Sequence, residues 1–159
     1  TAANLADYPL PLFNGPFPEN GEDVPQSAWL LAQRLGLQDG LVLVSGEHHG
    51  GMPTLLKNAI DWVAFTAARQ SRPLEPYRRL VVGLAGATPD GGGGRAALAQ
   101  LRDVLAHLGA EVITAQFVLP HANEAFSDRG EMIDKRESER LDGFLDLFLD
   151  HSRALARQA

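Results

Sequence analysis

Two short segments, 40–45 and 80–85, are uninterrupted runs of apolar and small residues, and a third apolar region spans 111–119. A strand with one face in water alternates apolar and polar residues, whereas a strand covered on both faces is apolar throughout. The first two segments therefore predict buried strands of a parallel sheet, and 111–119 predicts a third strand.

The segments between these runs carry apolar residues at helical spacing instead. One apolar face recurs over 55–63 after Pro53, another over 97–108 before Gly109, and a third over about 134–156. A shorter helix is predicted at 26–35, ending near Gly36. Strands that alternate with helices predict an α/β fold, a doubly wound parallel sheet with helices on both faces. We expect one domain over residues 1–159.

The segment before the first predicted helix is rich in residues that break regular structure. Because each proline fixes φ and removes a backbone donor, residues 6–25 are predicted to form a long extended or turning loop. Its prolines are Pro9, Pro11, Pro16, Pro18 and Pro25.

Composition excludes several classes of function. The 159 residues include 14 basic and 20 acidic side chains, for a net charge of −6, and no cysteine. Phosphate neutralisation requires a basic excess, so no nucleic-acid partner is expected. No apolar run approaches the roughly 20 residues that span a bilayer, so no membrane partner is expected. The absence of cysteine excludes disulfides, thiolate metal sites and a cysteine nucleophile.

Glycine is concentrated where ligands would bind. Seven of the 16 glycines lie in the windows 46–51 and 91–94, each between a predicted strand and a predicted helix. In an open α/β sheet this is the edge where ligands collect, and glycine there lets the backbone approach a ligand. A tight strand-to-helix turn also needs glycine for its own geometry, so a turn without a ligand remains the alternative.

The two windows carry more than glycine. The segment Ser45–Trp62, with the run Leu56-Lys57-Asn58-Ala59-Ile60-Asp61-Trp62, resembles the signature loop and helix of the NADPH-dependent FMN reductase family. The segment Ala87–Arg95 resembles that family's Gly-rich loop, and Leu5–Pro11 resembles the segment after its second strand. The resemblance covers nearly the whole chain and implies a flavodoxin-like fold.

The sequence departs from the family pattern at three places. Gly46 stands where the family has Pro, and His48 stands where it has Tyr. The family's first strand ends in a Gly-Ser-x-Arg-x-x-Ser loop that holds the FMN phosphate, and the 159 residues contain no such loop. Without that central strand, residues 41–44 would form an exposed apolar edge. Either an upstream unit precedes Thr1 or the fold has lost it, and we expect an N-terminally incomplete domain.

The resemblance implies an NAD(P)H-dependent reductase that uses FMN, with NADPH or NADH as co-substrate. Hydride would pass from the nicotinamide to flavin N5, and electrons would then pass to a quinone, a free flavin, an azo compound or a metal oxyanion. Because the cofactor carries the reaction, no catalytic side chain is assigned. The expected cofactor-binding residues are Glu47, His48, His49, Gly50 and Gly51 in the first window, and Thr88, Gly91, Gly92, Gly93, Gly94 and Arg95 in the second.

Simpler interpretations remain open for several of these residues. A metal site at Glu47, His48 and His49 is disfavoured, because adjacent side chains point in different directions and the remaining ligands are at unknown distances. Arg95 could contact a ligand phosphate or be a solvated charge. A basic cluster of Arg69, Arg72, Arg78 and Arg79 could meet the NADPH phosphate, although a solvated surface is favoured.

The resemblance also implies a cytoplasmic protein that is a homodimer or homotetramer through the helix with Lys57, Asp61 and Trp62. The alternatives are core packing for Trp62 and Phe65 and a surface ion pair for Lys57 and Asp61. Two rival functions stay open: a flavodoxin-like electron carrier without nicotinamide oxidase activity, and a cofactor-free scaffold.

Overall fold

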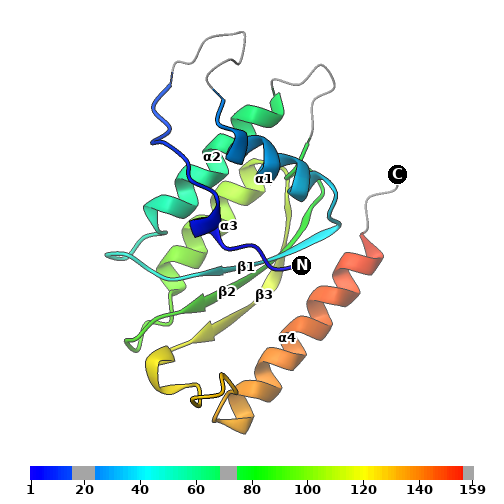
Figure 1. Ribbon diagram of the computed structural model, residues 1–159. Helices are drawn as coiled ribbons and strands as arrows, with labels where there is room; N and C mark the ends of the chain where they lie inside the picture. Colours follow the sequence, from blue (N-terminus) through cyan, green and yellow to red (C-terminus); the bar gives the residue numbers. More distant parts are fainter. Residues whose placement is uncertain (16–23, 69–74, 156–159) are drawn as a thin grey trace. The chain divides into compact units, whose positions relative to one another are not determined.

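The computed structural model describes residues 1–15, 24–68 and 75–155. Pro16, Pro18, Arg69 and Arg72 from the analysis above lie outside the described residues, as does Ala156 at the predicted end of the last helix. The chain divides into two compact units, Thr1–Gln38 with Thr54–Arg78 and Asp39–Pro53 with Arg79–Ala159. Figure 1 shows their elements in chain order. The single-domain organisation stays a prediction.

The second unit contains the predicted parallel sheet. Its strands are β1 (Gly40–Ser45), β2 (Val81–Ala87) and β3 (Glu111–Leu119), in the order β1-β2-β3 (Figure 1). The register pairs Gly40 with Val81 and Ser45 with Gly86. β2 continues two residues beyond the predicted run, because Gly86 and Ala87 pair with Val118 and Leu119.

Two helices of this unit cover opposite faces of the sheet, as predicted. Helix α3 (Arg95–His107) packs on β2 and β3, and helix α4 (Lys135–Ala154) packs on the same two strands. A Cβ built on Gly83 would lie 2.9 Å from Cζ of Phe144 in α4, whereas one built on Gly86 would lie 3.2 Å from Cδ1 of Leu98 in α3. Residues separated by an odd number along a strand face opposite sides, so the two helices lie on different faces.

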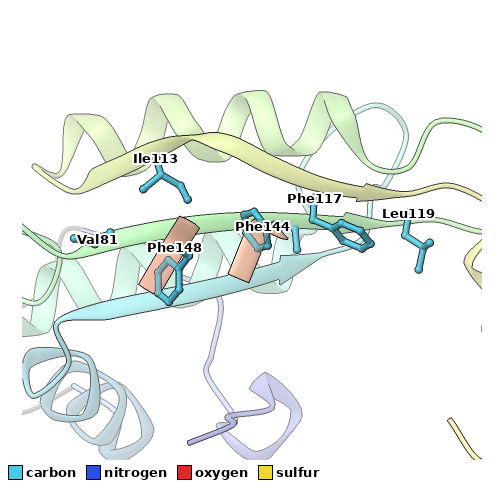
Figure 2. Close-up of a cluster of buried hydrophobic side chains, with 7 residues drawn as sticks. Val81, Ile113, Phe117, Leu119, Phe144 and Phe148 are labelled. Carbon is cyan, nitrogen blue, oxygen red and sulfur yellow. The ribbon is translucent and has the colours of Figure 1, made fainter. Parts of the chain in front are cut away.

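The face covered by α4 holds an aromatic core. Figure 2 shows Phe144 and Phe148 of α4 against the side chains of β2 and β3, including Ile113 and Phe117. Gly83 has no side chain, which allows both rings to approach the strand closely. Burying each ring contributes about 1.5–3 kcal/mol relative to exposure. The core therefore depends on a small residue in the middle of β2.

The first unit contains α1 (Gln26–Gly36), α2 (Thr54–Ala68) and a short 3-10 turn, η1 (Leu5–Asp7). Trp62 of α2 is only 1% exposed, and its ring packs edge-on against Phe13 and Phe65. Core packing is thus the interpretation that the structure supports for Trp62. Lys57 and Asp61 form a partly exposed ion pair of 2.8 Å, as the i, i+4 alternative expects. An oligomer interface through α2 stays a prediction.

The N-terminal segment is held by residues of the helix motif. The side chain of Asn58 accepts a hydrogen bond from the Phe13 N–H (2.7 Å) and donates one to the Pro11 carbonyl (2.9 Å). The indole N–H of Trp62 donates to the same Pro11 carbonyl at 2.8 Å. Two residues of the family-like motif therefore bind backbone that lies about 45 to 50 positions earlier in the chain.

The two outer strands of the described sheet differ. The Arg102 guanidinium of α3 donates to the carbonyls of Val112 and Ile113, at the irregular register of β3. In β1, Val44 is 69% exposed, and among the described residues this strand pairs only with β2.

Within the described part of the chain, no helix combines the length and apolar character needed to cross a bilayer.

Candidate functional site

Both glycine windows lie at the carboxyl edge of the sheet, as predicted. The first loop follows β1 and the second follows β2, and Ser45 and Gly86 are register partners at the ends of these neighbouring strands. Because the strands are parallel, their loops leave the sheet at the same edge. The fold therefore brings the two predicted halves of the site together.

The first loop is built around a tight turn. His48 and Gly51 exchange two backbone hydrogen bonds of 2.9 and 3.0 Å, and the residues between them, His49 and Gly50, have φ of 51° and 76°. Two successive positive φ angles are typical of a type I′ turn, which favours Asn or Gly. Within the described chain, the N–H groups of His49 and Gly50 donate no hydrogen bond. The tip of the turn thus offers two backbone donors to a ligand.

Helix α3 holds both ends of this loop. The Glu47 carboxylate accepts hydrogen bonds from the N–H groups of Ala96 and Ala97 at 3.1 and 3.3 Å. It caps α3 in this way, because Gly94 at the N-cap position has no side chain to do so. At the other end, the Gln100 side chain accepts from the Met52 N–H (3.0 Å) and donates to the Gly50 carbonyl (3.4 Å). The Glu47 carboxylate is therefore occupied by hydrogen bonds to the backbone of α3.

The second loop is organised by a side-chain network. The Thr88 hydroxyl donates to Oδ1 of Asp90 at 2.7 Å and accepts from the Gly93 N–H at 2.8 Å. The same Asp90 oxygen accepts from the Gly92 N–H at 2.9 Å. These bonds, first the Thr88 hydroxyl and then the Gly92 N–H, lower the pKa of Asp90, and the nearby charge of His121 acts in the same direction. Thr88 thus stabilises the loop from within.

The four glycines of the second loop have different environments. Gly93 and Gly94 are buried with positive φ of 64° and 82°, and a Cβ on Gly93 would clash with Val118. Gly91 and Gly92 are exposed. Packing and turn geometry require glycine at positions 93 and 94, whereas Gly91 and Gly92 lie where a ligand could reach them. Within the described residues, the Gly91 N–H donates no hydrogen bond.

The remaining basic residues are placed as follows. Arg95 is exposed, and its guanidinium donates to the Gly92 carbonyl at 2.9 Å, so it braces the second loop. Arg78 pairs with Glu75 at 2.8 Å. Arg79 has a φ of 59°, and its N–H donates to the Gly109 carbonyl.

Among residues 1–15, 24–68 and 75–155, no group of three or more His, Asp or Glu side chains is placed to hold a metal ion.

Three residues at this edge were not assigned from the sequence: Asp90, Gln100 and His121. Asp90 follows Pro89 and precedes a glycine, which is a turn signature that could have identified it. His121 adopts φ of 52° after β3, and its N–H donates to the Asp90 carbonyl at 2.9 Å. Gln100 carries no local signal, because its partners lie about 50 residues away.

Comparison with known proteins gives one family. A model of the family described as NADPH-dependent FMN reductase matches residues 1–124. The NADH:(hydroxy)cinnamate reductase subunit CrdA of Vibrio ruber is 29% identical over 136 residues, which are 84% of this chain and 62% of that protein. The 2-hydroxy-1,4-benzoquinone reductase of a Burkholderia species is 25% identical, over 87% of this chain and 72% of that protein. The quinone reductase of Escherichia coli K12 is 28% identical, over 91% and 73%. The chain thus spans less than two thirds of the Vibrio relative.

A solved structure shows the same arrangement of elements. FerB, a flavoenzyme NAD(P)H:(acceptor) oxidoreductase from Paracoccus denitrificans, is similar with a TM-score of 0.78 and 26% identity. The similarity covers 96% of this chain and 79% of FerB. The predicted flavodoxin-like α/β fold is therefore confirmed.

Proposed function

This chain belongs to the NADPH-dependent FMN reductase family, and from that premise we propose that it takes hydride from NAD(P)H onto FMN and passes the electrons to a quinone. Membership implies FMN as the cofactor and NAD(P)H as the co-substrate. The observation that carries the proposal is the pair of loops at one sheet edge, whose tips offer unpaired backbone donors and exposed glycines.

The donor set of these loops fits the ring system of a flavin. That ring is flat, has carbonyl oxygens and nitrogens along its edge, and gains negative charge on reduction. Backbone N–H groups at His49, Gly50 and Gly91 supply donors for such an edge. A Cβ on Gly50 would meet no atom within 4 Å, so the tip of the turn has open space for a ligand. The proposal concerns the ring, since the 159 residues contain no phosphate loop of the family's pattern.

Each predicted cofactor residue then has a distinct role. His49, Gly50 and Gly91 would contact the ring through the backbone, with His48 beside them and Gly92 at the surface of the second loop. Gly51, Gly93 and Gly94 shape the two loops. The side chains of Glu47, Thr88 and Arg95 hold the loops in place. FMN, when bound, supplies the hydride and electron chemistry, so the chain needs no acid or base of its own.

A quinone is the proposed acceptor because two of the relatives are named for quinones. We expect a homodimer or homotetramer in the cytoplasm, where NAD(P)H is available, with Lys57 and Asp61 on the exposed side of α2. An interface there would use these side chains.

The test is anaerobic reduction of the purified full-length protein, followed by visible absorbance. NADPH or NADH should bleach bound FMN promptly, and addition of 1,4-benzoquinone should restore the colour. A yellow protein that neither nucleotide bleaches would indicate an electron carrier, and a protein that cannot be reconstituted with FMN would indicate a scaffold. Either result would overturn the proposal.

A matched pair of glycine variants tests the placement of the ring. Gly50 and Gly130 have φ of 76° and 78°, and a Cβ on either would meet no atom within 4 Å. Gly50→Val and Gly130→Val therefore carry similar backbone strain, but only Gly50 lies at the proposed site. We expect FMN binding about tenfold weaker in Gly50→Val alone, measured by quenching of FMN fluorescence. Equal affinities in the two variants would contradict the placement.

A further inference from the structure

Helix α3 contacts the first loop through a residue that no sequence motif marks. Gln100 lies on the second turn of α3. Its side-chain amide hydrogen-bonds to the Gly50 carbonyl and to the Met52 N–H, the backbone groups on either side of Gly51. Its oxygen accepts from the Met52 N–H, and its nitrogen donates to the Gly50 carbonyl. One side chain thus matches a donor and an acceptor of the loop simultaneously, because an amide has a separate oxygen acceptor and nitrogen donor.

These two bonds decide which backbone groups of the loop remain for a ligand. The Gly50 carbonyl and the Met52 N–H are occupied by Gln100, and the N–H of Gly51 is occupied by His48. The N–H groups of His49 and Gly50 are left open within the described chain. The ligand-facing part of the turn therefore presents donors, which suits a ring that becomes negatively charged on reduction.

The same helix fixes the loop at its other end and carries the second loop at its own start. The Glu47 carboxylate is bonded to the first turn of α3, and Gly94 of the second loop is the residue before that turn. Between Glu47 and Met52 the turn is held by its own two backbone bonds and by the bond from Gln100 to the Gly50 carbonyl. The position of the open donors relative to the second loop is therefore set by α3.

We propose that Gln100 is a positioning residue that holds the turn His48–Gly51 so that its open N–H groups face the flavin ring. This inference rests on the proposed function, because the ring is its target. Gln100 acts through the loop backbone and touches no reacting atom. Its removal should leave the fold intact, because Gln100 is exposed.

Three variants of the full-length protein separate the two bonds. Gln100→Met keeps the length of the side chain and removes both bonds. Gln100→Glu keeps an acceptor for the Met52 N–H but has no donor for the Gly50 carbonyl. Ala99→Met places the same new side chain at the adjacent exposed position of α3 and serves as the control.

Two readouts report on the flavin and one does not require it. Hydrogen exchange of the Met52 amide, measured by NMR without FMN, should be faster in Gln100→Met than in the wild type. FMN binding should be about fivefold weaker, since two exposed hydrogen bonds contribute modestly. The midpoint potential of bound FMN should become more negative, because the donors stabilise the reduced form. For the exchange of the Met52 amide, Gln100→Glu should lie between the wild type and Gln100→Met, because it keeps the acceptor. Ala99→Met should match the wild type in all three measurements.

The outcomes distinguish this inference from the proposed function. Wild-type affinity and midpoint potential in Gln100→Met would overturn the positioning role, even if its thermal stability fell. Equal effects of Ala99→Met and Gln100→Met would also overturn it. A wild-type protein that binds no FMN would refute the proposed function, and the exchange rate of the Met52 amide would then decide whether Gln100 positions the loop.

Discussion

Asn58 should be the residue of the helix motif on which the N-terminal segment depends most. Asn58→Ala removes the bond to the Phe13 N–H and the bond to the Pro11 carbonyl. The Pro11 carbonyl keeps one partner, the indole N–H of Trp62. The Phe13 N–H loses its 2.7 Å hydrogen bond to the Asn58 side chain, so the N-terminal segment is held less tightly on α2.

The expected loss of stability follows from these bonds. Each half-buried hydrogen bond contributes about 1 kcal/mol net, so Asn58→Ala should lower the free energy of unfolding by about 2 kcal/mol. The adjacent Lys57→Ala removes only a partly exposed ion pair and should cost about 0.5 kcal/mol or less. Trp62→Phe keeps an aromatic ring and removes the second donor to Pro11, which should cost about 1–2 kcal/mol.

A double-mutant cycle tests the shared acceptor. Either Asn58 or Trp62 alone keeps the Pro11 carbonyl paired, whereas loss of both removes the two side-chain donors that reach it within residues 1–15, 24–68 and 75–155. The double variant should therefore lose about 1 kcal/mol more than the sum of the single variants. Urea unfolding followed by far-UV circular dichroism, which does not depend on tryptophan emission, measures the wild type and all four variants. Additive losses, or an Asn58→Ala loss no larger than that of Lys57→Ala, would refute the reasoning.

Changes at three further positions test the loops. Thr88→Val should raise the pKa of Asp90 toward its ordinary value of 3.8, seen in an NMR pH titration, because the hydroxyl is the main cause of its lowered pKa. In the wild type, the ionised Asp90 carboxylate stabilises the fold above pH 3.8, and this stability is lost as the pH falls through the lowered pKa. Thr88→Val should reduce that acid-dependent loss of stability. Gly93→Ala should lower the melting temperature markedly, since its φ is positive and its Cβ would meet Val118; an unchanged melting temperature would contradict this packing. His49→Asn should preserve stability and His49→Val should cost about 1–2 kcal/mol, and equal stabilities would argue against the turn geometry.

The positions of the main elements could be predicted because their signals are local. Residues 40–45 and 111–119 are β1 and β3, and Gly109, with φ of 86°, follows the end of α3 as predicted. The helix motif also identified the family that the comparison later gave. Glycine in both loops indicated the edge of the sheet where the site lies.

The roles of individual side chains at that edge could not be predicted in the same way. Glu47 was assigned to cofactor binding through its backbone, but its carboxylate caps α3. Trp62 had two equal interpretations until the structure placed its indole against Phe13 and Pro11. Gln100 contacts Gly50 and Met52 without any motif around it. Each of these contacts joins residues about 50 positions apart, so no local pattern contains them.

The sequence by itself determined the fold class, the family and the two loops, because hydrophobic periodicity and glycine placement act over a few residues. Only the tertiary structure decided which polar groups of those loops are occupied and which are open. That division depends on helix α3 packing on β2 and β3, which brings Glu47 and Gln100 into contact with their backbone partners. Hydrogen-bond partners are set by such packing in three dimensions, and the spacing of residues along the chain does not encode them.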